Sequence, residues 1–255
     1  MSDYQVPAVV GAIKVLAELG RPGESGPTQA ELAEATGLSK STLHNLLSTL
    51  AAHEYIRRES GTRRYRLGPA LIPLGTAATR QVKLVRSTLD RIAPMAEKHH
   101  LTFAIAQRTG EDEVQIIERF YPASVVHVGI TVGSSFGPLD GAVGKVLLSA
   151  MDPERSERLI GERNLPAHTD ATITSPEDLV QEVEQVRKLG WATSRGEFTE
   201  NNAVAAGIRT HSGDLGLLLL VLGFGNQLDE RRIEEVGQLL RITADSIMAE
   251  AGVSL

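Results

Sequence analysis

Arginine residues cluster in one short segment of a chain that is acidic overall. Arg57, Arg58, Arg63, Arg64 and Arg66 stand between Tyr55 and Leu67 against a single acid, Glu59. The net charge of -6 opposes nucleic-acid binding by the chain as a whole, because phosphate groups require positive potential. A local concentration of guanidinium groups still suits phosphate contacts. The segment therefore predicts a local nucleic-acid-binding surface, although a solvated hairpin face has the same composition.

A second polar cluster precedes these arginines, on a helix expected from about Lys40 to His53. Its apolar face would carry Leu43, Leu46, Leu47 and Leu50, and its opposite side Ser41, His44, Asn45 and Ser48. A polar face without acids suits insertion into a groove of DNA. The amide of Asn45 can donate to and accept from one adenine edge, so this residue is the best candidate for base recognition. The alternative is an ordinary exposed face.

Two more helices would position this face. Helical spacing of Val9, Ala12, Ile13, Leu16 and Leu19 predicts an amphipathic helix over Val6 to Leu19. Thr28-Gln29-Ala30-Glu31 has the form of a capping box and predicts a helix from about Gln29 to Thr36. Gly37-Leu38-Ser39 would then supply a tight turn and a cap. This order predicts a helix-turn-helix, whose second helix enters the major groove.

A β-hairpin is expected directly after the helix-turn-helix. Tyr55 to Glu59 and Arg63 to Leu67 alternate like strands, with Ser60-Gly61-Thr62 as the turn between them. This hairpin would be the wing of a winged helix. The predicted DNA contacts are Thr28, Ser39, Lys40, Ser41, Thr42, His44, Asn45, Ser48, Arg57, Arg58, Arg63 and Arg64.

The rest of the chain predicts two linker helices and a larger α+β domain. The linker helices would span Ala70 to Thr79 and Val82 to His99, broken or kinked by Pro73 and Pro94. Strands are predicted over Thr102 to Arg108, Val114 to Phe120, Val125 to Val132, Asn202 to Ile208 and Leu215 to Gly223. Helices are predicted over Gly141 to Ala150, Pro153 to Ile160, Pro176 to Leu189 and Asp229 to Ala251. The expected domains are 1–68, a linker over 69–98, and 99–255, the last with one layer of helices on a mixed sheet.

Three motifs that could carry other chemistry have simpler explanations. Gly137 to Lys145 is rich in glycine, but Leu139 and Val146 occupy positions where a phosphate loop needs Gly and Ser or Thr. His99 and His100 are adjacent on a helix and point in different directions, so they do not suggest a metal site. Asp140, Glu197 and Glu200 have no nucleophile motif nearby. We expect no enzyme activity, no cofactor and no metal.

Composition and termini indicate an intracellular protein. The chain has no cysteine, which excludes thiol catalysis and disulfides. Its first residues lack the pattern of a signal peptide. The most apolar run, Leu215 to Leu222, is too short to cross a bilayer and predicts a buried strand. We expect a cytoplasmic protein that does not bind membranes.

These motifs, in this order, resemble the IclR (isocitrate lyase regulator) family of transcription factors over nearly the whole chain. In the N-terminal part the similar segments are Gln29 to Ala33, Gly37 to Thr42, Leu46 to Leu50, Tyr65 to Gly68 and Leu71 to Gly75. In the C-terminal part they are Gly141 to Leu148 and Gly190 to Glu197. The resemblance implies a winged helix-turn-helix joined to a GAF-like effector domain. It also implies a homodimer, sometimes a tetramer, that binds double-stranded DNA at a partly palindromic operator and responds to a small molecule.

Departures from the family pattern bear on what the chain recognises. Asn45 stands where many members carry arginine, so a guanine contact would be replaced by one suited to adenine. In the effector domain, Leu139, Leu220 and Leu222 stand where polar residues are common in the family. The implied effector-binding residues are Val125, His127, Val128, Phe136, Gly141, Ala142, Val143, Asn201, Ala203, Leu220 and Leu222. Such an apolar wall predicts an aromatic or otherwise hydrophobic effector, whose carboxylate could meet free amides at the start of a helix.

Two alternatives remain open. The second domain could serve only in oligomerisation, with the apolar residues filling its pocket. It could also be an enzyme with an attached DNA-binding head, although no catalytic signature supports this. A cavity of a few hundred cubic ångströms behind Ala142 would favour a ligand-binding domain.

Overall fold

The computed structural model describes residues 5–21, 26–59, 61–81, 83–123, 126–162 and 164–252. The chain forms two compact units, Met1–Val82 and Lys83–Leu255. The division falls within residues 69–98, which the sequence analysis assigns to a linker. Helix α4 (Leu71–Gln81) therefore belongs to the first unit and helix α5 (Lys83–His99) to the second.

Ahead of α4, the first unit forms a three-helix domain with a β-hairpin, as predicted. It contains α1 (Pro7–Leu19), α2 (Gln29–Thr36), α3 (Lys40–Ala52), β1 (Ile56–Arg58) and β2 (Tyr65–Leu67). The two strands pair antiparallel and are shorter than expected. A small core of Val15, Leu32, Leu43, Leu47 and Ile56 joins the three helices to the first strand of the wing.

The buried face of α1 differs from the predicted one. Val9 and Ile13 are 56% and 60% exposed, whereas Gly11 and Val15 are buried. A Cβ atom at Gly11 would lie 2.9 Å from Cδ1 of Leu46, so this glycine lets α1 approach α3 closely. The closest contact between the helices thus forms around a residue that the apolar spacing did not include.

The second unit is built on a six-stranded sheet with the order β5-β4-β3-β8-β7-β6. Its strands are β3 (Thr102–Arg108), β4 (Val114–Phe120), β5 (Ser135–Phe136), β6 (Ala192–Arg195), β7 (Asn202–Arg209) and β8 (Leu215–Gly223). All pairings among the described strands are antiparallel, so the sheet is not the mixed sheet that was expected.

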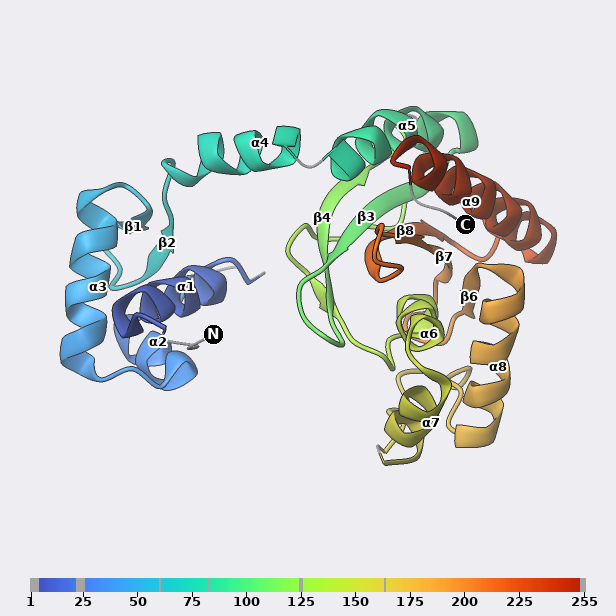
Figure 1. Ribbon diagram of the computed structural model, residues 1–255, viewed down its shortest axis with the longest axis horizontal. Coiled ribbons are helices and arrows are strands. Elements are labelled where there is room, and N and C mark those ends of the chain that lie inside the picture. The colour runs from blue at the N-terminus through green and yellow to red at the C-terminus, as the bar shows by residue number, and fades with distance from the viewer. Residues whose placement is uncertain are drawn as a thin grey trace. The chain divides into compact units, whose positions relative to one another are not determined.

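Helices cover both faces of this sheet, whereas one layer was expected (Figure 1). On one face α5 and α9 (Glu230–Glu250) pack against Leu217, Leu219 and Val221 of β8. On the other face α6 (Gly141–Ala150) packs against Leu218 and Leu220 of the same strand. Successive side chains of a strand point to opposite faces, so the long apolar run of β8 is that of a central strand covered on both sides.

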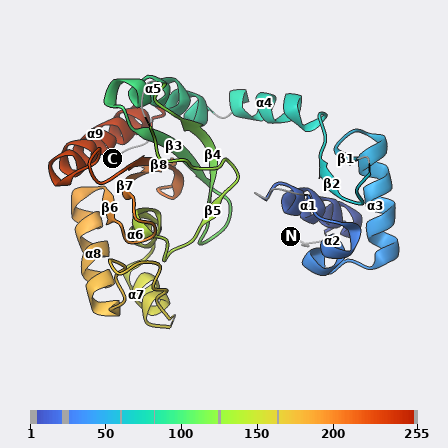
Figure 2. The same ribbon diagram turned by 180° about the vertical axis from the view of Figure 1, so that it is seen from behind.

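Two further helices complete the α6 side of the sheet. They are α7 (Pro153–Glu162) and α8 (Pro176–Leu189), and Figure 2 shows them from behind. Val186 of α8 joins the core under α6. Prolines interrupt the helices less than predicted. Pro94 lies inside α5, which continues past it, and Pro73 is the third residue of α4, where a missing N–H is tolerated.

The predicted strand over Val125 to Val132 is wrong for its described part, residues 126–132, which contain no strand. Val125 itself lies outside the described residues. Side chains, and not the main chain of a neighbouring strand, form hydrogen bonds with this segment. The Thr102 hydroxyl donates a 2.7 Å hydrogen bond to the carbonyl of Val128. The Tyr121 hydroxyl lies 2.7 Å from the carbonyl and 3.0 Å from the amide of Ile130. These bonds occupy the main-chain groups that would form a ladder.

Candidate nucleic-acid interface and effector pocket

Local capping fixes the turn between α2 and α3. Thr28 and Glu31 form the predicted capping box, with the Thr28 amide 2.6 Å from the Glu31 carboxylate. Gly37 ends α2 with φ 68°, a conformation that favours glycine. Ser39 then caps α3 by accepting a 3.2 Å hydrogen bond from the amide of Thr42. The helix-turn-helix geometry therefore follows from short-range signals in the sequence.

Helix α3 has one buried and one exposed face, as predicted. Leu43 and Leu47 enter the core, and no acid occurs between Lys40 and Ala52. Exposed polar residues on the other side of the helix include Ser41, Thr42, His44, Asn45 and Ser48. The part of the chain that the structure describes offers no hydrogen-bond partner to the side-chain amide of Asn45. This amide is therefore available to an external ligand.

A groove of about 510 Å³ brings several of the predicted DNA contacts together within the first unit. Thr28 comes from the start of α2, Lys40 and His44 from α3, and Arg58 and Arg63 from the wing. Arg57 neighbours Arg58 on the strand and lies 3.8 Å from the Glu54 carboxylate. Because adjacent strand residues face opposite sides, only one of these two arginines lines the groove.

Two of the clustered arginines, Arg64 and Arg66, make hydrogen bonds within their own domain. Arg64 donates a 2.7 Å hydrogen bond to the carbonyl of Gly26 and lies 3.4 Å from Glu31, leaving its side chain 33% exposed. Arg66 pairs with Glu59. Arg64 thus fastens the wing to the start of α2, and its role as a DNA contact stays a prediction.

The same contacts shift the acidity of both carboxyl groups. Hydrogen bonds from the Thr28 amide and hydroxyl, together with the nearby Arg64, lower the pKa of Glu31. Hydrogen bonds from Arg66 and Thr62 lower the pKa of Glu59. Both carboxylates are therefore held in the charged form that the arginines require.

A separate cavity of about 130 Å³ lies in the second unit, at the start of α6. It is smaller than the few hundred cubic ångströms proposed from the sequence. The predicted effector residues that line it are Val128, Phe136, Gly141, Ala142, Val143, Asn201, Ala203, Leu220 and Leu222. His127 is not among the lining residues, because its ring stacks on Tyr121 with the centroids 4.2 Å apart.

The cavity has further walls that sequence reasoning missed. They come from Gly129, Ile130, Asp140, Ser194, Phe198 and Thr199. The Phe198 ring meets Phe136 edge to face at 5.8 Å between centroids. Phe198 directly follows Glu197, the end of a segment singled out in the sequence, so its position beside that segment was the available signal.

The first turn of α6 lies against this cavity. Gly141, Ala142 and Val143 line it, and a helix leaves its first amides without intrahelical partners. Asp140 precedes the helix but does not cap it, because its carboxylate accepts a 2.6 Å hydrogen bond from the Gly137 amide. Gly141 has φ 54°, and a Cβ atom there would lie 3.1 Å from both Phe198 Cβ and Ser194 Oγ. The cavity is thus apolar with an amide-lined end that suits a carboxylate.

A buried ion cluster supports this end of α6. Lys145 is 2% exposed, and its Nζ lies 2.8 Å from Glu197, 3.0 Å from Glu182 and 2.9 Å from the carbonyl of Thr193. The cluster ties α6 to α8 and to the turn after β6. In the sequence Lys145 belongs to a failed phosphate loop and to a segment similar to the IclR family, and neither indicates this role, because its partners are distant in the chain.

The described residues hold neither a membrane-spanning helix nor a group of three or more His, Cys, Asp or Glu residues arranged to hold a metal ion. His99 belongs to no such group. Burial, followed by the charge of Lys98, lowers its pKa.

Comparisons with known proteins give consistent matches over both units. The family described as "IclR helix-turn-helix domain" matches residues 10–60, and "Bacterial transcriptional regulator IclR C-terminal" matches residues 76–249. The chain is 26% identical over 254 residues to the HTH-type transcriptional regulator KdgR of Escherichia coli (strain K12), covering 98% of this chain and 95% of that relative.

Solved structures show the same fold. The crystal structure of an IclR transcriptional regulator from Alicyclobacillus acidocaldarius has a TM-score of 0.88 and 29% identity, covering 98% of this chain and 100% of that one. An IclR homologue from Microbacterium hydrocarbonoxydans, complexed with 4-hydroxybenzoate, has a TM-score of 0.76 and 20% identity, covering 97% and 100%. The second likeness concerns the fold alone.

Proposed function

The chain belongs to the IclR family of bacterial transcriptional regulators, and we propose that its α3 and wing bind an operator while the cavity at the start of α6 binds a small aromatic acid. The family consists of transcriptional regulators, and we assign the chain no catalytic role. Since its operator is bacterial DNA, we place its action in the cytoplasm. The groove that joins α2, α3 and the wing carries this proposal.

In the proposed complex α3 lies in the major groove of DNA. His44 and Asn45 contact base edges, because both are exposed on the face opposite the core. Lys40, Arg58 and Arg63, which line the groove beside them, contact phosphates. The overall negative charge does not oppose this arrangement, since the cations are gathered at the surface that meets DNA.

Salt dependence of operator binding tests the proposed phosphate contacts. The full chain is compared with Arg63→Ala and with Arg86→Ala, which removes an exposed arginine of α5 that lies 4.0 Å from Asp90. Arg63→Ala should reduce the slope of log affinity against log salt by about one unit, and Arg86→Ala should not. Equal slopes for all three proteins would show that Arg63 contacts no phosphate.

The size and lining of the α6 cavity support a ligand with one aromatic ring. A cavity of about 150 Å³ accommodates benzene in another protein, which is close to the 130 Å³ found here. Phe136 and Phe198 offer ring edges, and the α6 amides offer hydrogen bonds to a carboxylate. The 4-hydroxybenzoate bound to the Microbacterium homologue belongs to this class of molecule.

Effector control requires two DNA-binding heads whose relative placement changes. We propose a homodimer or tetramer that meets half-sites of a partly palindromic operator about 34 Å apart, or a multiple of that distance. An effector that favours one placement would change operator affinity by about 1 to 3 kcal/mol. The direction of regulation follows from where the operator lies relative to a promoter.

Thermal unfolding in the presence of candidate ligands tests the effector class. Benzoate and 4-hydroxybenzoate should raise the melting temperature, and succinate should not. Ala203→Val fills the cavity and should abolish the rise, whereas Ala205→Val, at a buried site outside the cavity, should lower the starting stability but keep the rise. A response to succinate alone would refute the aromatic class. No response to any of these acids would favour a domain that only oligomerises.

A further inference from the structure

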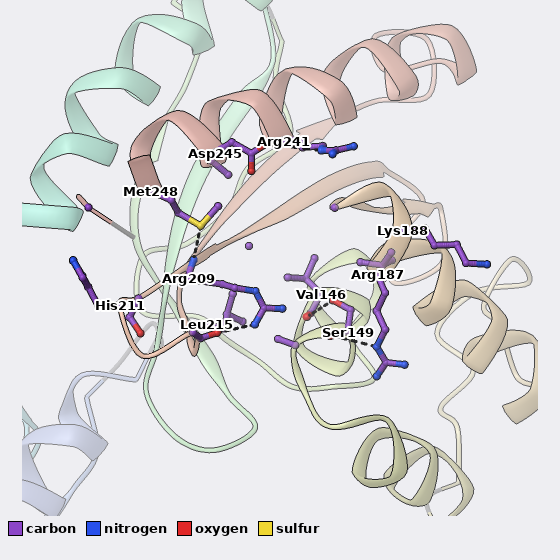
Figure 3. Close-up of a pocket in the computed structure, with 18 residues that line it drawn as sticks. Val146, Ser149, Arg187, Lys188, Arg209, His211, Leu215, Arg241, Asp245 and Met248 are labelled. Atoms are coloured by element: carbon purple, nitrogen blue, oxygen red, sulfur yellow. Dashed lines mark hydrogen bonds and ion pairs between the residues drawn. The ribbon is translucent and has the colours of Figure 1, made fainter. Parts of the chain in front are cut away.

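A second hollow in the effector domain is much larger than the α6 cavity. Its volume is about 650 Å³, and it lies between the later part of α6, the end of α8, the β7–β8 hairpin and α9 (Figure 3). It shares no lining residue with the cavity at the start of α6. We refer to it as the basic cleft.

Positive charge predominates along the basic cleft. Arg187 and Lys188 come from α8, Arg209 from β7 and Arg241 from α9, whereas the carboxylate of Asp245 is the one acid among the described lining residues. These cations belong to three separate elements of a chain whose net charge is -6. Cations from three elements around one concave site give it a local positive potential, and field lines concentrate in such a site.

The cations differ in how far the protein itself satisfies them. Arg187 pairs with Glu184 and donates a 2.9 Å hydrogen bond to the Ser156 hydroxyl, so it holds the fold together. Lys188 and Arg209 have no carboxylate within 4.0 Å among the described residues. Arg241 lies 3.9 Å from Asp245, a distance at which the pairing is loose. Three cations of the cleft are therefore incompletely compensated.

Two hydrogen bonds within the protein fix the position of Arg209. Its main-chain amide donates to Sδ of Met248 at 3.2 Å, and its Nη1 donates to the carbonyl of Gly213 at 2.7 Å. The register of the β7–β8 pairing shifts between Ile208 and Arg209. Figure 3 shows Arg209 between Met248 and Leu215. One guanidinium bond to the protein leaves further N–H donors for an anion.

Part of the wall of the basic cleft is apolar, and Ser149, Thr210 and His211 add polar groups. Val146, Leu215, Ala244 and Met248 line the cleft together with the charged groups. Arg241 lies across Gly190, with its Cδ atom 3.3 Å from the place where a Cβ would be, so a side chain at position 190 would displace it. The combination suits a molecule that carries several negative charges on a carbon skeleton.

We propose that the basic cleft binds a small multivalent organic anion, a phosphorylated or polycarboxylate metabolite, at a site separate from the α6 cavity. Guanidinium and ammonium groups of β7, α8 and α9 would contact the anionic groups, and the apolar wall would contact the skeleton. The site does not depend on the identity of the α6 ligand.

Calorimetric titration of the full chain tests this site with citrate and fructose 1,6-bisphosphate, and with acetate as a monovalent comparison. Arg209→Gln should weaken binding of the multivalent probe about tenfold, the loss expected for a charged hydrogen bond. Asp245→Asn should tighten binding about threefold, because it removes the one repulsive carboxylate. Arg231→Gln, on the exposed start of α9, is the matched control and should leave affinity unchanged.

The outcomes separate the cleft from other basic surfaces. Tighter binding of citrate would indicate a polycarboxylate ligand, and tighter binding of the bisphosphate a phosphorylated one. Either result supports the site if Arg209→Gln weakens binding of that probe. Binding that is insensitive to Arg209→Gln but lost in Arg63→Ala belongs to the DNA-binding surface and overturns the proposal, as does the absence of binding by either probe at millimolar concentration. If Arg209→Gln does not fold, an unchanged affinity in Asp245→Asn overturns it instead.

Discussion

The groove beside α3 and the cavity at the start of α6 are built in opposite ways. The groove gathers exposed cationic and polar side chains that lie between Thr28 and Tyr65. The cavity gathers mostly apolar groups that lie between Val128 and Leu222. Charge in water gives affinity that salt weakens, whereas burial of apolar surface gives affinity that salt affects little. The two regions should therefore respond differently to the same perturbations.

The ion pairs near the two regions also differ in how far they are exposed to solvent. In the first unit Arg57 and Glu54 lie 3.8 Å apart and both are well exposed. In the second unit the Lys145 side chain is 2% exposed and that of Glu197 11%, while Glu182, their third partner, is 38% exposed. An exposed pair contributes little to stability, whereas removal of one partner from a buried pair leaves an uncompensated charge.

Lys145→Met should have the largest effect on stability. The Glu197 side chain, 11% exposed, would lose its buried cation, and we expect the free energy of unfolding to fall by about 3 kcal/mol. The free energy of unfolding of the second unit is measured by urea unfolding, monitored by the fluorescence of Trp191, the one tryptophan of the chain. Arg231→Met, which removes an exposed pair with Glu235, should cost at most about 1 kcal/mol. Equal losses would contradict the distinction between buried and exposed pairs.

Asn45→Ala tests base recognition in the groove. If its amide contacts one adenine edge, affinity for the operator should fall by about 1 to 3 kcal/mol, because each correct base contact contributes that much. Affinity for a scrambled duplex should not change. Fluorescence anisotropy at fixed salt measures both duplexes. Equal losses on the two duplexes would move recognition to another residue.

Sequence alone predicted the parts of the molecule that depend on neighbours in the chain. The Thr28 capping box, the turn at Gly37 and the Ser39 cap are confirmed, and so are the limits of α6 and α8. Each depends on residues within one or two turns. The strand order and the coverage of both sheet faces depend on contacts between distant segments, for which local patterns contain no signal.

The candidate sites were also predicted only in part, because some of their contacts join distant residues. Family resemblance identified most residues of the α6 cavity, but it also included His127, whose ring stacks on Tyr121 and does not line the cavity. Composition suggested that the clustered arginines of the wing form a nucleic-acid-binding surface, yet Arg64 binds Gly26, 38 residues earlier. Lys145 binds Glu197, 52 residues later. Which polar groups are satisfied within the fold is a three-dimensional property, and residue types alone do not determine it.

Gly141→Ala should have an intermediate effect, confined to the cavity. With φ 54° and only 3.1 Å to Phe198, an alanine would be strained, and we expect a loss of about 1 to 2 kcal/mol in stability. It should also weaken binding of aromatic acids, because the amides beside it would move. Gly161→Ala in α7, where a Cβ meets nothing within 4 Å, should instead be neutral or slightly stabilising. If stability falls but affinity for aromatic acids does not, the start of α6 does not contribute to ligand binding.

The smallest effect should appear in the acid stability of the first unit. The pKa of Glu31 is lowered by hydrogen bonds from Thr28 and by Arg64, so its stabilising contribution is fully present above its ordinary value and is lost as pH falls through the lowered one. Glu31→Gln should therefore be less stable than the parent chain near neutral pH, and the difference should shrink on acidification. Glu34→Gln, at an exposed position of the same helix, is the control. Helical circular dichroism during urea unfolding at several pH values measures the difference. A gap that stays constant with pH would mean that the carboxylate charge of Glu31 does not contribute to the joint between α2 and the wing.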